Sequence, residues 1–87
     1  MTELHEMLNI GLGLEKELKK VGIKTPDKLQ EVGSKEAYKR LKEVGVPNLN
    51  INKLASLQGA IENVKKYALS EETRENIEDF YYELEKF

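Results

Sequence analysis

The residues best placed to do chemistry are two glycines and a set of lysines around them. Ile10-Gly11-Leu12 is a predicted glycine turn that would leave backbone N–H groups exposed at the start of the helix from about Gly13. Such N–H groups, together with the helix dipole, can hold a phosphate without contacting a base. The residues predicted to contact nucleic-acid backbone are Gly11, Gly13, Lys16, Lys19, Lys20, Lys24, Lys35 and Lys39.

A second explanation of the same lysines stays open. Glu15 and Glu17 lie among them and would repel a phosphate. The lysines would then be solubilising side chains on a solvated helix face. Lys35 and Lys39, with Arg40 and Lys42, form a further basic set farther along the chain.

Few other residues suggest catalysis. The chain has no cysteine and a single histidine, His5, so neither a thiolate nucleophile nor a metal site is expected. The glycine pair is too short for a dinucleotide or P-loop motif, and no strand is predicted before it. We therefore expect no enzyme activity, no metal and no cofactor.

Four of the six aromatic residues lie within the last eight residues, at Phe80, Tyr81, Tyr82 and Phe87. Ile77, Phe80, Tyr81 and Leu84 follow the spacing of one helix face and are predicted to cover the core. Tyr82 and Phe87 are predicted to contact a partner, because aromatic side chains are enriched at protein interfaces. The partner would be another protein or a second copy of the chain in a homodimer.

A repeated phrase predicts the elements that position these residues. LKKVG occurs at 18–22, LQEVG at 29–33 and LKEVG at 41–45. Leucine and valine three residues apart share a helix face, and the glycine suits the left-handed position that ends a helix. The phrase therefore predicts short helices, each ended by glycine, rather than strands or a coiled coil.

The caps and apolar spacing give the expected helices in order. Thr25, Ser34, Asn50 and Ser70 are predicted N-caps, and Pro26 suits a first helical position. Leu8 is expected to pack on the second helix. Gly59, inside a helix, predicts a neighbouring helix that crosses closely. The predicted helices span about 3–9, 13–21, 26–32, 35–44, 51–67 and 71–87.

Length and composition indicate one domain over residues 1–87. The expected class is all-α, with five to six helices and a helix-hairpin-helix at about residues 3–22, in a SAM-like arrangement. Residues 1–69 carry a net charge of +3 and residues 70–87 a net charge of −5. No signal peptide or membrane span is predicted, and the lack of cysteine fits the cytoplasm.

Four blocks of the sequence have a specific pattern. They are LNIG at 8–11, VGIKTPDKL at 21–29, VGSKEAYKRL at 32–41 and NLNINKLASLQGAIE at 48–62. With these blocks the sequence resembles the C-terminal domain of the TfoX family, bacterial regulators of competence for DNA transformation. The resemblance implies an all-helical domain associated with transformation or transcriptional regulation, here without the N-terminal domain of the full regulators. A looser similarity, from Leu18 to Thr25, links it to the C-terminal domain of the RNA polymerase alpha subunit.

Two hypotheses of function follow. In the first, the chain is a non-catalytic regulatory module that contacts DNA or RNA backbone through the hairpin turn and its lysines. In the second, it is a protein-interaction domain of the same fold that binds no nucleic acid. The acidic last helix favours the second, because it would repel a polyanion.

Overall fold

Helices make up all the regular structure in residues 3–86, the part of the chain that the computed structural model describes. The predicted all-α class is confirmed. No helix in this part is both long and apolar enough to cross a membrane. Five α-helices and two 3-10 turns follow one another as η1 (Leu4–Glu6), α1 (Leu12–Lys20), α2 (Pro26–Val32), α3 (Ser34–Glu43), α4 (Ile51–Glu62), η2 (Lys66–Ala68) and α5 (Glu71–Glu85).

The three glycines of the repeat all adopt positive φ, at +86° for Gly22, +89° for Gly33 and +80° for Gly45. The first and third copies end α1 and α3 with the same kind of hydrogen bond: the N–H of Ile23 donates to the Leu18 carbonyl, and that of Val46 to the Leu41 carbonyl. The second copy differs, because Gly33 ends α2 and also caps α3. Gly33 is therefore the single residue that connects α2 to α3.

The predicted caps Thr25, Asn50 and Ser70 are confirmed. Each side chain accepts a hydrogen bond from a backbone N–H three residues later. The prediction for Ser34 is wrong, since it is the first residue of α3 rather than its cap. Gly33 itself takes the N-cap position of α3, and the buried Ser34 hydroxyl instead donates to Gln58 on α4.

Two predicted helices are shorter than expected. The helix expected at 3–9 is only the turn η1, and α4 ends at Glu62 rather than near residue 67. The turn η1 ends because Met7 already has an extended backbone, and α4 ends because its C-cap Asn63 adopts a left-handed backbone at φ +60°. Asparagine tolerates this conformation better than most side chains. Leu8 therefore does not pack on α1 and is 39% exposed, while Leu4 is fully buried.

The Asn9 side chain connects the N-terminal segment to the segment that follows α4. Its Nδ2 donates to the Val64 carbonyl over 2.9 Å, and its Oδ1 accepts from the Lys66 N–H over 3.1 Å. These partners lie 55 and 57 residues away in the sequence. The amide passes so close to Gly59 that an added Cβ would stand 2.5 Å from Nδ2 and 2.6 Å from the Val64 carbonyl oxygen. The close neighbour predicted at Gly59 exists, but it is a side chain and a loop rather than a helix.

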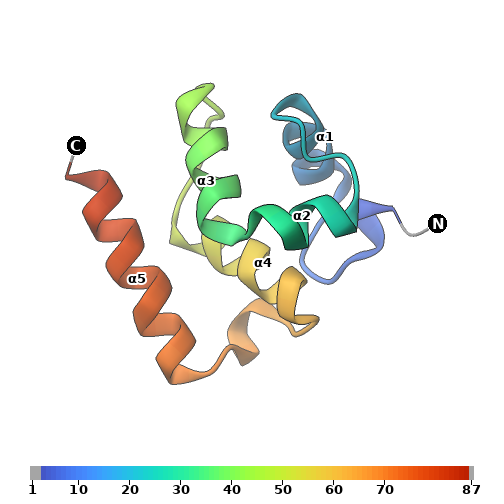
Figure 1. Cartoon of the computed structure of the whole chain (residues 1–87). Helices are drawn as coiled ribbons and strands as arrows, with labels where there is room; N and C mark the ends of the chain where they lie inside the picture. The colour runs from blue at the N-terminus through green and yellow to red at the C-terminus, as the bar shows by residue number, and fades with distance from the viewer. Residues whose placement is uncertain (1–2, 87) are drawn as a thin grey trace.

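Helices α1 and α3 stand side by side above α2 and α4, and α5 lies at the edge of the molecule (Figure 1). Helix α5 packs mainly against α4 and contributes one buried apolar residue, Ile77, with Phe80, Tyr81 and Leu84 partly buried against the core. The core consists of Leu4, Ile10, Leu14, Leu18, Ile23, Leu29, Ala37, Tyr38, Leu41, Leu54, Leu57, Ala60, Leu69 and Ile77.

Alanine at Gly59 tests the junction at Asn9. We expect Gly59→Ala to lower the free energy of unfolding by about 1–3 kcal/mol, because the methyl group must displace the Asn9 amide or the Val64 carbonyl. Gly13→Ala is the matched control, since Gly13 is also helical but an added methyl group there would meet no atom within 4 Å. It should be neutral or stabilising by up to about 1 kcal/mol. Urea unfolding of both variants measures the two free energies. Equal changes in both variants would contradict a close contact between Gly59 and Asn9.

Candidate functional site

The glycine turn lies at the start of α1, as the sequence predicts. Gly11 is the N-cap of α1 and has an extended backbone with no side chain to satisfy the first N–H groups. Gly11, Leu12 and Gly13 are exposed, and Leu12 is 69% exposed. The helix start therefore faces solvent with an apolar side chain at its tip.

A buried carboxylate lies in the first turn of the same helix. Glu15 is 7% exposed, and its Oε2 accepts a hydrogen bond from the His5 backbone N–H over 2.9 Å. The His5 Nδ1 lies 3.0 Å from the same oxygen, and the Lys19 Nζ lies 3.9 Å from Oε1. The His5 backbone bond, helped by the His5 ring and Lys19, holds the pKa of Glu15 below its ordinary value. The start of α1 thus already carries its own anion.

The sequence identified Glu15 only as a charge that repels phosphate. Its partner His5 lies ten residues earlier. The sequence alone predicts no function for this histidine. The single histidine of the chain lies just across a hairpin turn from a glutamate on an otherwise apolar face. That combination is the signal that would have pointed to the contact.

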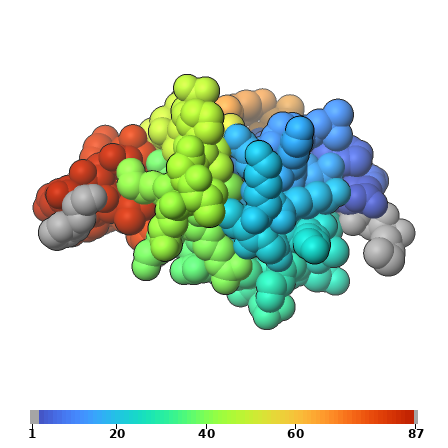
Figure 2. Space-filling view, turned by 90° about the horizontal axis from the view of Figure 1, so that it is seen from above, coloured from blue at the N-terminus to red at the C-terminus, as the bar shows by residue number. Residues whose placement is uncertain are grey.

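The predicted lysines divide into two groups. The first belongs to α1 and the loop that follows it, and α1 lies beside α3 (Figure 2). Arg40 of α3 links the two helices, since its Nη1 donates to the Val21 carbonyl at the end of α1. Lys19 lies near Glu15, and the others make no ion pair with a described residue. The first group consists of Lys16, Lys19, Lys20 and Lys24.

Lys35 belongs to a different surface. Its ammonium donates to the Asn76 side chain on α5 and lies 5.8 Å from the centre of the Phe80 ring. Lys42, farther along α3, pairs with Glu85 of α5 over 3.1 Å. Part of the predicted basic set is therefore used to attach the acidic last helix.

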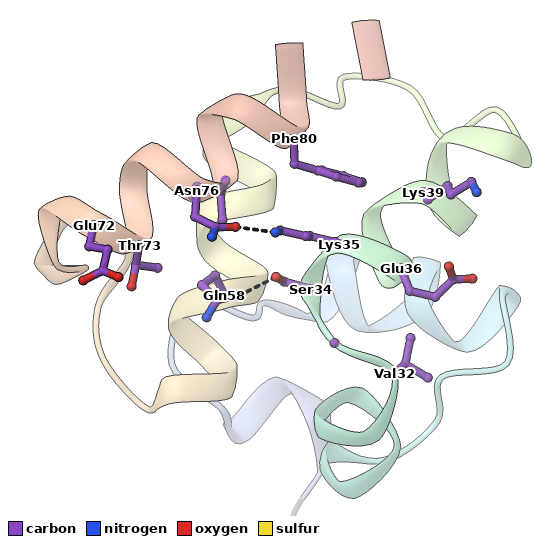
Figure 3. Close-up of a pocket in the computed structure, with 12 residues that line it drawn as sticks. Val32, Ser34, Lys35, Glu36, Lys39, Gln58, Glu72, Thr73, Asn76 and Phe80 are labelled. Atoms are coloured by element: carbon purple, nitrogen blue, oxygen red, sulfur yellow. Dashed lines mark hydrogen bonds between the residues drawn. The ribbon is translucent and has the colours of Figure 1, made fainter. Parts of the chain in front are cut away.

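A groove of about 690 Å³ separates α3 from α5, with Gln58 of α4 at its base. In Figure 3, the Phe80 side chain points from α5 toward α3, and Lys35 reaches across to Asn76. The groove brings Lys35 and Lys39 together but contains no other predicted lysine. Its lining consists of Val32, Gly33, Ser34, Lys35, Glu36, Lys39, Gln58, Glu72, Thr73, Asn76, Ile77 and Phe80.

The sequence comparison agrees with this architecture. A family model described as the TfoX C-terminal domain matches residues 1–81. The chain belongs to that family. The resemblance first seen in blocks between residues 8 and 62 thus extends over most of the domain.

Two solved structures are similar to this TfoX C-terminal domain. An uncharacterized protein from Listeria monocytogenes, in a triclinic form, matches with a TM-score of 0.92 and 38% identity, over 97% of this chain and 94% of that one. A protein of unknown function from the same species, in a tetragonal form, matches with a TM-score of 0.87 and 38% identity, over 93% of this chain and 98% of that one. No curated protein matches the sequence.

In this TfoX C-terminal domain, α5 covers a tyrosine whose hydroxyl is unsatisfied. Tyr38 on α3 is fully buried, and its ring meets that of Tyr81 edge to face at 6.2 Å. The hydroxyl has no hydrogen-bond partner among the described residues. Burial, with smaller effects of Tyr81 and Glu85, raises the pKa of Tyr38 to about 12. The docking of α5 therefore buries a polar atom at a cost in free energy.

Tyr82, predicted to contact a partner, is 60% exposed, and its ring meets that of Tyr81 at 5.4 Å. Phe87, the other predicted contact, lies outside the described residues. Partner binding by either residue stays a prediction. Among residues 3–86, no three His, Asp or Glu side chains are grouped as metal ligands would be.

Phenylalanine at position 38 tests the buried hydroxyl. We expect Tyr38→Phe to raise the free energy of unfolding by about 1 kcal/mol, because it removes an unsatisfied polar atom and keeps the ring. Tyr67→Phe is the control, since Tyr67 is 67% exposed and its hydroxyl is solvated. Thermal and urea unfolding measure both. A loss of stability in Tyr38→Phe alone would show that the hydroxyl makes a bond.

Proposed function

We propose that this TfoX C-terminal domain is a non-catalytic regulatory module that acts by binding another protein. The observation that carries the proposal is the Glu15 carboxylate in the first turn of α1. A phosphate held at that helix start would lie near an ionised side chain that is fixed in place by His5. Like charges at close range in a partly buried site disfavour such binding.

The exposed side chains at the turn support the same function. Leu12 is 69% exposed and Leu8 is 39% exposed, on either side of Gly11. Apolar side chains at a loop tip give nothing to a phosphate, whereas they suit a protein surface that excludes water.

The pairing of lysines is a further support. Lys35 and Lys42 attach α5, and Lys19 faces Glu15. These contacts reduce the positive charge available to a polyanion, and α5 adds negative charge beside α3.

Binding to nucleic-acid backbone is the second candidate. It is favoured by four exposed lysines on α1 and the loop that follows it, Lys16, Lys19, Lys20 and Lys24. Contacts from these lysines would give a salt dependence of log affinity with a slope of about −3 to −4.

A fluorescence titration with labelled duplex DNA and single-stranded RNA at low salt separates the two candidates. We expect no binding tighter than about 10⁻⁴ M, the weak end of non-specific affinity. Tighter binding would contradict the proposal if it weakens with salt and is lost in Lys16→Glu/Lys20→Glu. The control Lys53→Glu changes an α4 lysine that lies outside the predicted set, so it should behave as wild type.

A further inference from the structure

We propose that the groove between α3 and α5 binds an amphipathic helix of a partner protein, with an apolar ridge, an acidic flank and a basic flank. The proposal rests on the proposed protein-binding function and names the site and the chemistry of the partner. Three features of the groove carry it: its apolar part, the different net charges of its two rims, and the weak contact that now spans it.

The apolar part of the groove centres on Phe80. Phe80 is half-buried and points toward α3, and Val32 and the buried Ile77 also line the groove. Phe80 and Ile77 lie three residues apart and so share one face of α5. A volume of about 690 Å³ is within the range of about 300–1,000 Å³ typical of ligand pockets, large enough for several side chains of a helix ridge.

The two rims differ in net charge. On α3, Lys35 and Lys39 lie four residues apart and are exposed. The carboxylate of Glu36 between them pairs with Arg40 over 3.0 Å. On α5, Glu72 lines the groove, and Asp79 shares its face at a spacing of seven residues. Lys39, Glu72 and Asp79 form no ion pair within residues 3–86. A helix between the rims would therefore need an acidic flank toward α3 and a basic flank toward α5.

The contact across the groove can be replaced by a contact with a partner. It consists of the Lys35 ammonium bonded to Asn76, and both residues are exposed. Exposed polar pairs of this kind contribute little to stability. An acidic side chain of the partner can replace Asn76 as the acceptor, and the Phe80 ring then becomes available to an apolar side chain.

A second copy of the chain fits the groove less well. The segment with the matching shape would be its own α5, but residues 70–87 carry a net charge of −5. Such a helix would meet the acidic rim of α5 with like charge, which disfavours pairing. A helix with one basic flank avoids that repulsion.

Three synthetic helices of about 16 residues test the charge pattern. All share one leucine ridge, and their flanks are acidic and basic, both acidic, or both basic. We expect the mixed peptide to bind the intact chain at least about threefold more tightly than the other two, since each exposed ion pair adds a modest gain. Calorimetry gives the affinities, and backbone amide shifts in ¹⁵N spectra locate the peptide on α3 and α5.

Reversal of one rim makes the test specific. In Lys35→Glu/Lys39→Glu both rims are acidic, so the preference should move to the peptide with two basic flanks. Lys16→Glu, on α1 and outside the groove, should keep the preference for the mixed peptide. Phe80→Ala should weaken mixed-peptide binding by about tenfold or more, while Tyr82→Ala, about 200° away around α5, should leave it unchanged.

Several outcomes would overturn the inference. Equal affinities for all three peptides, no binding, or loss of binding in Tyr82→Ala rather than Phe80→Ala would each do so. If the peptide changes only the amide shifts around Leu8 and Leu12, it does not bind in the groove. That result would contradict the inference but leave the proposed protein-binding function in place. If sedimentation shows a dimer that Phe80→Ala abolishes, the groove is occupied by a second copy of the chain rather than by a partner helix. Tight oligonucleotide binding by a chain that binds no peptide would overturn the proposed function as well.

Discussion

The hydrogen bonds between Glu15 and His5 are the contact on which the N-terminal half of this domain depends. Residues 4–10 form only one short turn of their own, so tertiary contacts must hold them in place. The carboxylate accepts the His5 N–H and thereby fixes this segment on α1, with Leu4 fully buried beneath it. Asn9 follows at the correct place to bond Val64 and Lys66. Two polar side chains thus connect the start of the chain to α1 and to the end of α4.

The opposite end of the molecule is organised differently. Helix α5 contributes one buried apolar residue and covers a tyrosine hydroxyl that has no partner among the described residues. Its position is supported by side chains that reach from α3, through Lys35 and Lys42. An open groove lies between α5 and α3. In our proposal, the N-terminal half is the scaffold and this groove is the binding surface.

Local signals in the sequence predicted most of the fold. The glycine after each leucine–valine pair marked where α1, α2 and α3 end, and Thr25, Asn50 and Ser70 marked where helices begin. These signals act within one helical turn, so a single sequence reveals them. The errors arose where a side chain serves a distant residue. Asn9, expected at the end of the first helix, instead has a left-handed backbone and bonds Val64, and Ser34 bonds Gln58 instead of capping α3.

The candidate site was predicted in position but not in chemistry. The exposed glycine turn lies where the sequence indicated, but the contact of Glu15 with His5 depends on a chain reversal that no local pattern contains. The groove between α3 and α5 was also beyond prediction, because it depends on the angle at which α5 leaves α4. Membership of the TfoX C-terminal domain family supports a regulatory role, and the protein partner is our proposal, which rests on the buried Glu15 carboxylate at the start of α1.

An NMR pH titration of the Glu15 carboxyl carbon, with and without a short oligonucleotide, tests the central claim that α1 begins with its own anion. We predict a pKa below the ordinary value of a glutamate that the oligonucleotide leaves unchanged. A pKa at or above the ordinary value would contradict the buried contact with His5. A pKa that rises when the oligonucleotide is added would place a phosphate beside Glu15 and would contradict the claim directly.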